Sequence, residues 1–199
     1  ILEKAQKMGK SVGLVSTTRL THATPAAFAS HIDHRDKENE IAVQMLETGP
    51  DVMLAGGWRH WVPKSVEGST REDERDLLAE AEAKGYTVVR DTEGFKKVDA
   101  LTVGKLLGLF TKSHLSYDID RKPEKEPSLA ELTQKAIEIL SRNKKGFFLM
   151  VEGGRIDHAA HANDAASVVH DTLAFDEAIK VALDYFARDP ETLIVVTAD

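Results

Sequence analysis

The sequence predicts an α/β layered sandwich, in which helices cover both faces of a mostly parallel sheet. Apolar runs with the length of strands alternate with helical patterns along the chain. These runs are apolar at nearly every position, as in parallel strands that are buried on both faces. The length of 199 residues corresponds to a single α/β domain over residues 1–199, which we expect to be part of a larger domain.

The first part of the chain supplies three helices and two strands. We expect a helix at Ile1–Met8, a strand at Ser11–Ser16, helices at 24–34 and Asp36–Glu47, and a strand at Asp51–Ala55. Thr24 is the expected N-cap of the second helix, and Pro25 is its first helical residue. In the third helix, Ile41, Met45 and Leu46 share one apolar face.

The middle of the chain, at about 58–127, is expected to be less regular and insertion-like. It contains a predicted helix at Arg71–Lys84, strands at Tyr86–Arg90 and Lys105–Phe110, and a polar loop at His114–Pro127. The last part should form a helix at Ser128–Asn143, a strand at Phe147–Val151, a long helix at Ala165–Phe186 and a final strand at Leu193–Val196. Ser128 and Glu131 form a capping-box pattern. The expected inner stripe of the long helix is Val168, Val169, Leu173, Ala178, Ile179, Ala182, Leu183 and Phe186.

Composition excludes several classes of protein. The chain has 26 Lys and Arg residues against 33 Asp and Glu, and a net charge of −7 argues against broad binding of nucleic acid. Because there is no cysteine, His and carboxylate side chains must hold any transition metal. No apolar run approaches the roughly 18 residues of a membrane span, so no such span is expected.

Candidate ligands for a cation follow three of the predicted strands. In open α/β sheets, ligands bind beyond the carboxyl ends of the strands. The first strand, the strand at Phe147–Val151 and the last strand place polar side chains there, and we expect these side chains to converge. The residues are His22, Thr24, Glu152, Asp157, His158, His161 and Asp199.

Each of these candidates has an alternative structural role. Asp157 and His161 are spaced i, i+4, so a helix would let them grip one cation or form an exposed salt pair. Glu152 directly follows a buried strand, so its carboxylate must be paired, hydrogen-bonded or metal-bound. Thr24 and Asp199 could instead be helix caps, and His22 and His158 ordinary loop residues.

Other conspicuous residues are interpreted as structural. Five histidines have no partner pattern and are expected to be structural or on the surface: His31, His34, His60, His114 and His170. Trp58 and Trp61 are expected to serve packing. The charged segment Glu72–Glu82 is expected to be a solvated helix face.

The motifs resemble those of the alkaline phosphatase family. The segment Glu152–His161 (EGGRIDHAAH) resembles the zinc-binding segment of that family, and it is the most specific of the matches. Ser16–Ala27 resembles the segment that carries a magnesium ligand, and Val195–Asp199 resembles a zinc-ligand strand. The similarity covers essentially the whole chain and is weakest from about Val62 to Pro127.

The resemblance implies metal-dependent hydrolysis of phosphate monoesters through a phosphoserine intermediate, with two zinc sites and one magnesium site. It implies that the first zinc is held by Asp157 and His161, the second by Asp199, and the magnesium by Glu152 and Thr24. It also implies that Arg35 clamps two phosphate oxygens, a task that suits a guanidinium fork. His22 and His158 match positions beside the third site, where histidine would make that site more zinc-like.

Parts of the family pattern are missing from the sequence. No serine here matches the nucleophile, and we expect this serine to lie upstream of Ile1 and further zinc ligands to follow Asp199. The isolated chain is therefore expected to be inactive. The expected partners are phosphate monoesters and inorganic phosphate, and the family resemblance allows a homodimer and implies an extracellular or periplasmic location. The alternatives are a sulfatase, phosphodiesterase or phosphomutase of the same superfamily, or a non-catalytic α/β domain.

Overall fold

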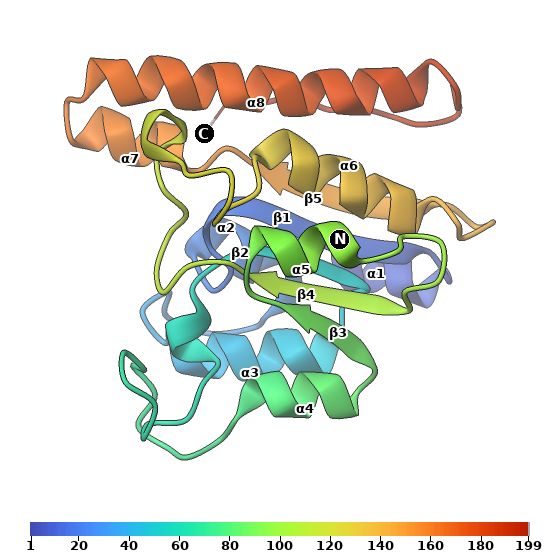
Figure 1. Ribbon diagram of the computed structural model, residues 1–199. Helices are drawn as coiled ribbons and strands as arrows, with labels where there is room; N and C mark the ends of the chain where they lie inside the picture. The colour runs from blue at the N-terminus through green and yellow to red at the C-terminus, as the bar shows by residue number, and fades with distance from the viewer. Residues whose placement is uncertain (199) are drawn as a thin grey trace.

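The computed structural model describes residues 1–198, which form a five-stranded, all-parallel sheet between layers of helices (Figure 1). The predicted fold class is confirmed. The strand order is β3-β4-β2-β1-β5. The strands are β1 (Ser11–Arg19), β2 (Val52–Gly56), β3 (Tyr86–Val89), β4 (Lys105–Leu109) and β5 (Phe147–Glu152).

Two apolar layers hold helices against the sheet. Alternate residues of a strand point to opposite faces, so Leu14 and Met53 belong to one layer while Val15 and Leu54 belong to the other. The first layer includes residues of α1 (Leu2–Lys7), α2 (Ala23–Ala29), α3 (Glu38–Thr48) and α4 (Leu77–Ala83). The second includes residues of α5 (Thr92–Lys97), α6 (Leu129–Leu140) and α8 (Ala165–Phe186). The remaining helical elements are η1 (Trp58–His60), η2 (Asp118–Asp120) and α7 (Arg155–His161).

Several predicted helix boundaries are corrected. His22, and not Thr24, is the N-cap of α2, and the helix ends at Ala29 rather than continuing to residue 34. The helix expected from Arg71 begins only at Leu77, because the Asp76 side chain accepts hydrogen bonds from two backbone N–H groups of the first turn. The capping box at the start of α6 is confirmed.

Helix α8 has the predicted bounds, but half of its predicted inner stripe is wrong. The side chains of Val169, Leu173, Leu183 and Phe186 are all exposed. Figure 1 shows α8 outside α6, so α8 packs on other helices. Its fully buried positions are Ser167, Asp171 and Ala178. The apolar pattern missed this face because two of those residues are polar and find local partners, in Asp164 for Ser167 and in the backbone N–H of Asp118 for Asp171.

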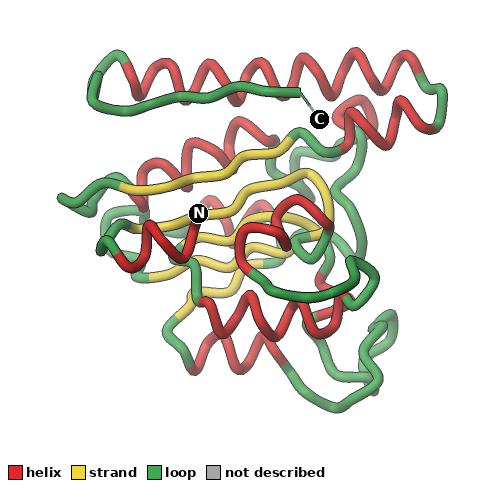
Figure 2. Tube along the Cα trace, turned by 180° about the vertical axis from the view of Figure 1, so that it is seen from behind, coloured by secondary structure: helices red, strands yellow, loops and turns green. Residues whose placement is uncertain are grey.

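The predicted strand at Leu193–Val196 is also wrong. Residues 193–198 have no ladder to the sheet and are drawn as a loop in Figure 2. Leu193 is 86% exposed and Val195 is 75% exposed. An apolar run becomes a strand only where a neighbouring strand supplies backbone partners, and this run has none among residues 1–198. Across the same residues, every helix is too short or too polar to form a membrane span.

Candidate active site

The carboxyl ends of β1 and β5 meet at one edge of the sheet. The two strands are parallel neighbours, and Ser16 lies opposite Glu152 in the register. Two of the three strand ends that the sequence predicted to converge therefore do so. Asp199, the candidate from the third strand end, lies outside the described residues.

Hydroxyl groups from β1 hold the carboxylate of Glu152. The Ser16 hydroxyl donates to Glu152 Oε2 at 2.5 Å, and Thr18 Oγ1 lies 3.4 Å from the same oxygen. Both hydroxyl residues are fully buried. Of the three alternatives expected for this carboxylate, the structure shows the hydrogen-bonded one. The strand then turns through Gly154, where a Cβ would lie only 2.5 Å from Thr18 Cγ2, so glycine is required for the close approach.

Helix α7 places Asp157 and His161 on one face. Asp157 Oδ1 lies 3.4 Å from His161 Nε2, and the two side chains are 50% and 81% exposed. The predicted i, i+4 geometry is thus present. An exposed salt pair and a pair of cation ligands would both have this geometry, and the exposure leaves the pair accessible to an ion from solvent.

Three histidines from three strand ends face one another at this edge. His22 follows β1, His114 follows β4, and His158 is on α7 after β5. The ring centroids of His22 and His114 are 5.3 Å apart, those of His22 and His158 are 5.2 Å apart, and those of His114 and His158 are 4.4 Å apart. We call these residues the histidine triad. The sequence shows no partner pattern for His114, and the structure places it against two other histidines.

An arginine contacts each ring of the histidine triad. Arg35 Nη2 donates to His22 Nε2 at 3.0 Å, and Arg155 Nη1 donates to His158 Nδ1 at 2.9 Å. The backbone N–H of Arg19 donates to His114 Nδ1 at 3.1 Å, and the Arg19 guanidinium contacts His114 Nε2. Arg155 also stacks on the Tyr117 ring, 3.8 Å from its centroid. Since guanidinium groups only donate, the contacted nitrogens of His22 and His158 act as acceptors.

These surroundings keep the histidine triad neutral at pH 7. Burial, reinforced by nearby arginines, lowers the pKa of His22 to about 4 and that of His114 to about 2. Burial and Arg155 also lower the pKa of His158. A neutral imidazole has one lone pair, which in His22 and His158 accepts from an arginine, and the neutral form is the one that can bind a cation.

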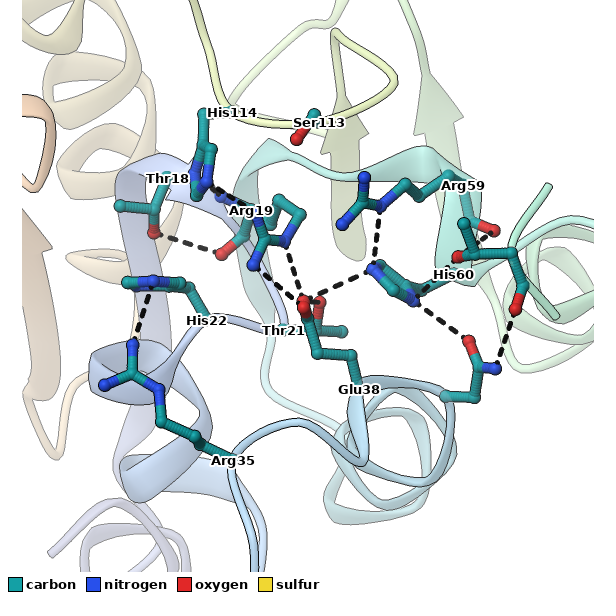
Figure 3. A network of polar contacts seen from close by, with 12 residues as sticks. Thr18, Arg19, Thr21, His22, Arg35, Glu38, Arg59, His60, Ser113 and His114 are labelled. Atoms are coloured by element: carbon teal, nitrogen blue, oxygen red, sulfur yellow. Dashed lines mark hydrogen bonds and ion pairs between the residues drawn. The ribbon is translucent and has the colours of Figure 1, made fainter. Parts of the chain in front are cut away.

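Next to the histidine triad, a second polar network surrounds Glu38 (Figure 3). Arg19 donates to both carboxylate oxygens of Glu38 at 2.8 Å, Thr21 donates at 2.6 Å, and His60 Nε2 lies 3.3 Å away. Burial opposes ionisation of Glu38, but the hydrogen bonds from Arg19 and Thr21 outweigh it and lower the pKa of the carboxyl. We call this the Glu38 network.

Arg35 and Arg155 differ from Arg19 in their partners. Within residues 1–198, the ion pairs involve neither Arg35 nor Arg155. Their guanidinium groups contact imidazoles and, for Arg155, an aromatic ring. Both therefore carry a positive charge that a bound anion can match.

The sequence did not identify three residues of these two clusters, and it did not indicate that a fourth residue, His114, lies among them. Arg19, Glu38 and Arg155 carry no spacing signal of their own. His114 had a usable signal, because it follows β4 and so lies at the same edge of the sheet as the other candidates. Thr24 lies in the first turn of α2 with an exposed side chain.

Comparison with protein families gives one consistent result. The family model described as alkaline phosphatase matches residues 1–199. The repressible alkaline phosphatase of Saccharomyces cerevisiae is 40% identical over 222 residues, which cover 100% of this chain and 39% of that protein. Alkaline phosphatase 4 of Bacillus subtilis is 38% identical over 205 residues, covering 100% of this chain and 42% of that protein. The chain thus spans about two fifths of the length of these curated relatives.

Solved structures of alkaline phosphatases are similar in fold to this chain. The alkaline phosphatase of Thermus thermophilus superimposes with a TM-score of 0.87 at 43% identity, covering 94% of this chain and 38% of that one. The enzyme of the Antarctic bacterium TAB5 gives 0.83 at 30% identity, with 95% and 52% coverage. A TAB5 variant with one histidine replaced by glutamate holds Mg in a site named M3; it gives 0.79 at 30% identity, with 95% and 51% coverage.

Proposed function

The chain belongs to the alkaline phosphatase family, and from this membership we propose that it is part of a metal-dependent enzyme that hydrolyses phosphate monoesters through a phosphoserine intermediate. One structural observation supports the proposal most strongly. At the shared end of β1 and β5, two guanidinium groups without carboxylate partners, those of Arg35 and Arg155, lie beside oxygen and imidazole donors suited to divalent cations. A doubly charged phosphoryl group needs both guanidinium groups and divalent cations as partners.

The donors of α7 fit the first zinc ion. Two ligands bound at about 2.1 Å to a tetrahedral ion lie about 3.4 Å apart. The distance from Asp157 Oδ1 to His161 Nε2 is 3.4 Å, so the two atoms can share such an ion without a change of helix. We assign Asp157 and His161 to this zinc and Asp199 to the second zinc.

The third cation is assigned to the end of β1 and β5. Glu152 and Thr24 offer the oxygen atoms that Mg²⁺ prefers. The Ser16 hydroxyl fixes one carboxylate oxygen of Glu152, which orients the group toward the edge of the sheet. His22 and His158 stand beside this site and belong to the histidine triad.

The chain's own residues then bind and orient the phosphoryl group. Arg35 presents two parallel N–H groups to two phosphate oxygens, which positions the ester for in-line attack. Arg155 adds positive charge on the same side. When bound, the zinc ions supply charge neutralisation and make a hydroxyl group and a water nucleophilic near neutral pH.

The remaining parts of the catalytic site are proposed to come from outside these 199 residues. None of the serines here matches the nucleophile of the family, so the isolated chain should hydrolyse little and hold metal weakly. For the whole enzyme, we propose phosphate monoesters and inorganic phosphate as ligands, an extracellular or periplasmic location, and a homodimer as a compatible arrangement.

A substrate panel on the full-length enzyme tests the proposed function. p-Nitrophenyl phosphate, bis(p-nitrophenyl) phosphate and p-nitrophenyl sulfate release the same chromophore, so their kcat/KM values compare directly. We expect the monoester to be hydrolysed faster than the other two by orders of magnitude, with activity lost to chelators and restored by zinc and magnesium. Preference for the diester or the sulfate would assign the enzyme to another branch of the superfamily, and no hydrolysis of any of the three would support a non-catalytic domain.

A further inference from the structure

The guanidinium of Arg155 has one edge of N–H donors that finds no acceptor among residues 1–198. Arg19, Arg71 and Arg75 each donate to a carboxylate through Nε and Nη2, the two donors of that edge. In Arg155, Nη1 donates to His158 Nδ1, whereas Nε is buried without a hydrogen-bond partner and Nη2 makes no hydrogen bond. Burying an N–H group without an acceptor is costly, and an oxyanion at this edge would remove that cost.

Tyr117 holds the same guanidinium by its face. The Cζ atom of Arg155 lies 3.8 Å from the centroid of the Tyr117 ring, the shortest cation–π contact within residues 1–198. Stacking uses the face of a guanidinium and leaves its in-plane N–H groups free to donate. Tyr117 therefore fixes Arg155 as Glu38 fixes Arg19, but without taking up the donors of the Nε and Nη2 edge.

The loop after β4 carries Tyr117, and its backbone is anchored on both sides of the ring. The N–H of Leu115 donates to the carbonyl of Thr17 on β1 at 3.0 Å. The N–H of Asp118 donates to Asp171 Oδ2 on α8 at 3.2 Å, and Asp171 is buried. These two anchors give the ring a fixed place, so the guanidinium that stacks on it is held in a fixed place as well.

Arg155 lies at the same pair of imidazoles as Arg35. The rings of His22 and His158 have centroids 5.2 Å apart; Arg35 donates to the first, as Figure 3 shows, and Arg155 donates to the second. The two arginines are held differently. Arg35 is exposed and its guanidinium contacts only His22 within residues 1–198, whereas Arg155 is half-buried and is held by both a hydrogen bond and a ring. Arg155 is therefore the preorganised member of the pair.

We propose that Arg155 is a second clamp of the phosphate site, which binds oxyanions through Nε and Nη2, and that Tyr117 is the positioning residue that holds it ready. The inference rests on the proposed function and adds these two roles to it. The two parallel donors of a guanidinium edge match two oxygens of a phosphate. Because the group is already ordered, its binding carries little further cost in conformational entropy. Both residues should therefore act mainly on the affinity for phosphate.

Phosphate binding by the full-length, metal-loaded enzyme tests both roles. Isothermal titration calorimetry gives the Kd of inorganic phosphate for the wild type and each variant. Arg155→Ala should raise Kd about tenfold, because it removes charge-assisted hydrogen bonds. Tyr117→Leu should raise it about threefold, and Tyr117→Phe, which keeps the ring, by less than about twofold. Arg188→Ala is the matched control and should leave Kd unchanged, because the exposed Arg188 lies over the Tyr185 ring at 5.9 Å, just beyond α8.

A double variant separates positioning from a purely structural role. If Tyr117 acts only through Arg155, the variant with both Tyr117→Leu and Arg155→Ala should bind phosphate as weakly as Arg155→Ala alone. In steady-state kinetics with p-nitrophenyl phosphate, KM should carry most of the loss in each variant and kcat little of it. A tyrosine that only supports the fold would lower affinity by the same factor whether or not Arg155 is present.

Three results would overturn the proposal. The first is an unchanged Kd in Arg155→Ala, and the second is a loss in the double variant equal to the product of the two single losses, with folding checked by circular dichroism. The third needs no variant: a crystal structure of the wild type with phosphate in which no phosphate oxygen lies within about 3.5 Å of Arg155 Nε or Nη2. A protein that hydrolyses no ester but binds phosphate through Arg155 would refute the proposed function and keep this inference.

Discussion

Two clusters of arginine and histidine lie side by side and share Arg19, but they differ in how their charges are matched. In the Glu38 network, a buried carboxylate receives hydrogen bonds from Arg19 and Thr21, and the neighbouring Arg71 donates to Asp73 through two nitrogens. In the histidine triad, Arg35 and Arg155 meet only neutral imidazoles and an aromatic ring.

The difference separates a structural cluster from a binding site. In the Glu38 network the carboxylate is matched by Arg19 and Thr21 within the chain, and removing Glu38 leaves the buried charge of Arg19 unpaired. A cluster whose guanidinium groups meet only neutral imidazoles has capacity left for an anion, and it can bind a cation once the arginines release the imidazole lone pairs. Substitutions in the Glu38 network should therefore reduce stability, and substitutions around the histidine triad and α7 should reduce activity.

The largest effect is expected at α7. In the full-length enzyme, Asp157→Ala or His161→Ala should lower kcat/KM for p-nitrophenyl phosphate by about 10²–10³-fold, because each removes a zinc ligand and with it the neutralisation of charge in the transition state. Added zinc should restore part of the loss. Glu93→Ala is the control, since Glu93 forms an exposed i, i+4 pair with Lys97 on α5. Unchanged activity in either α7 variant would show that the pair is only an exposed salt pair.

The next effect concerns stability. Glu38→Gln keeps the shape of the side chain but leaves the Arg19 guanidinium without its counter-charge, so urea unfolding should show a loss of about 3 kcal/mol. Glu40→Gln, on the exposed side of α3, should change stability by less than about 0.5 kcal/mol. If Glu38→Gln unfolds at the same urea concentration as the wild type, the Glu38 network does not stabilise the fold.

Arg35 should produce a smaller, purely kinetic effect. Arg35→Ala removes a clamp on phosphate and not the nucleophile, so KM should rise by about tenfold and kcat should fall modestly, with unchanged unfolding. Arg35→Lys should recover little, because an ammonium group lacks the two parallel donors. Steady-state kinetics with inorganic phosphate as a competitive inhibitor measure both effects, and unaltered phosphate inhibition in Arg35→Ala would remove Arg35 from the site.

The smallest effect is a pH dependence of stability. Burial lowers the pKa of His60 to about 4 from 6.5. Between these values the unfolded chain binds a proton that the folded chain does not, so stability falls as the pH drops from 7 toward 5. For His60 this loss should be no more than about 2 kcal/mol. Urea midpoints at pH 7 and pH 5 should differ less in His60→Gln than in the wild type, and equal differences would place the titrating group elsewhere.

The sequence predicted most of the fold, because alternating helices and nearly continuous apolar strands leave few arrangements other than a parallel sheet. The prediction from sequence was wrong where the buried residues are polar. The buried face of α8 carries Ser167 and Asp171 beside Ala178, so an apolar pattern identified only part of that face. The segment at Leu193–Val196 has the composition of a strand but no strand beside it among the described residues.

The candidate site could be predicted only in part, because local spacing reveals some of its residues and not the contacts between distant segments. Glu152 and the i, i+4 pair of α7 follow from local spacing, so the sequence alone identifies them. His114 reaches His22 and His158 only through the order of the strands, which places β4 and β5 on opposite sides of the β2–β1 pair. Arg155 and Glu38 act through contacts that have no fixed spacing in the sequence, so no local pattern could indicate them.

The most direct test of the central claim is a crystal structure of the full-length enzyme grown with zinc and inorganic phosphate, with data collected at the zinc edge. We predict an anomalous peak bonded to both Asp157 and His161, and a phosphate whose oxygens accept hydrogen bonds from Arg35, which has moved off His22. A map in which Asp157 and His161 remain paired only with each other, and in which Arg35 still contacts His22 while phosphate lies elsewhere, would contradict it.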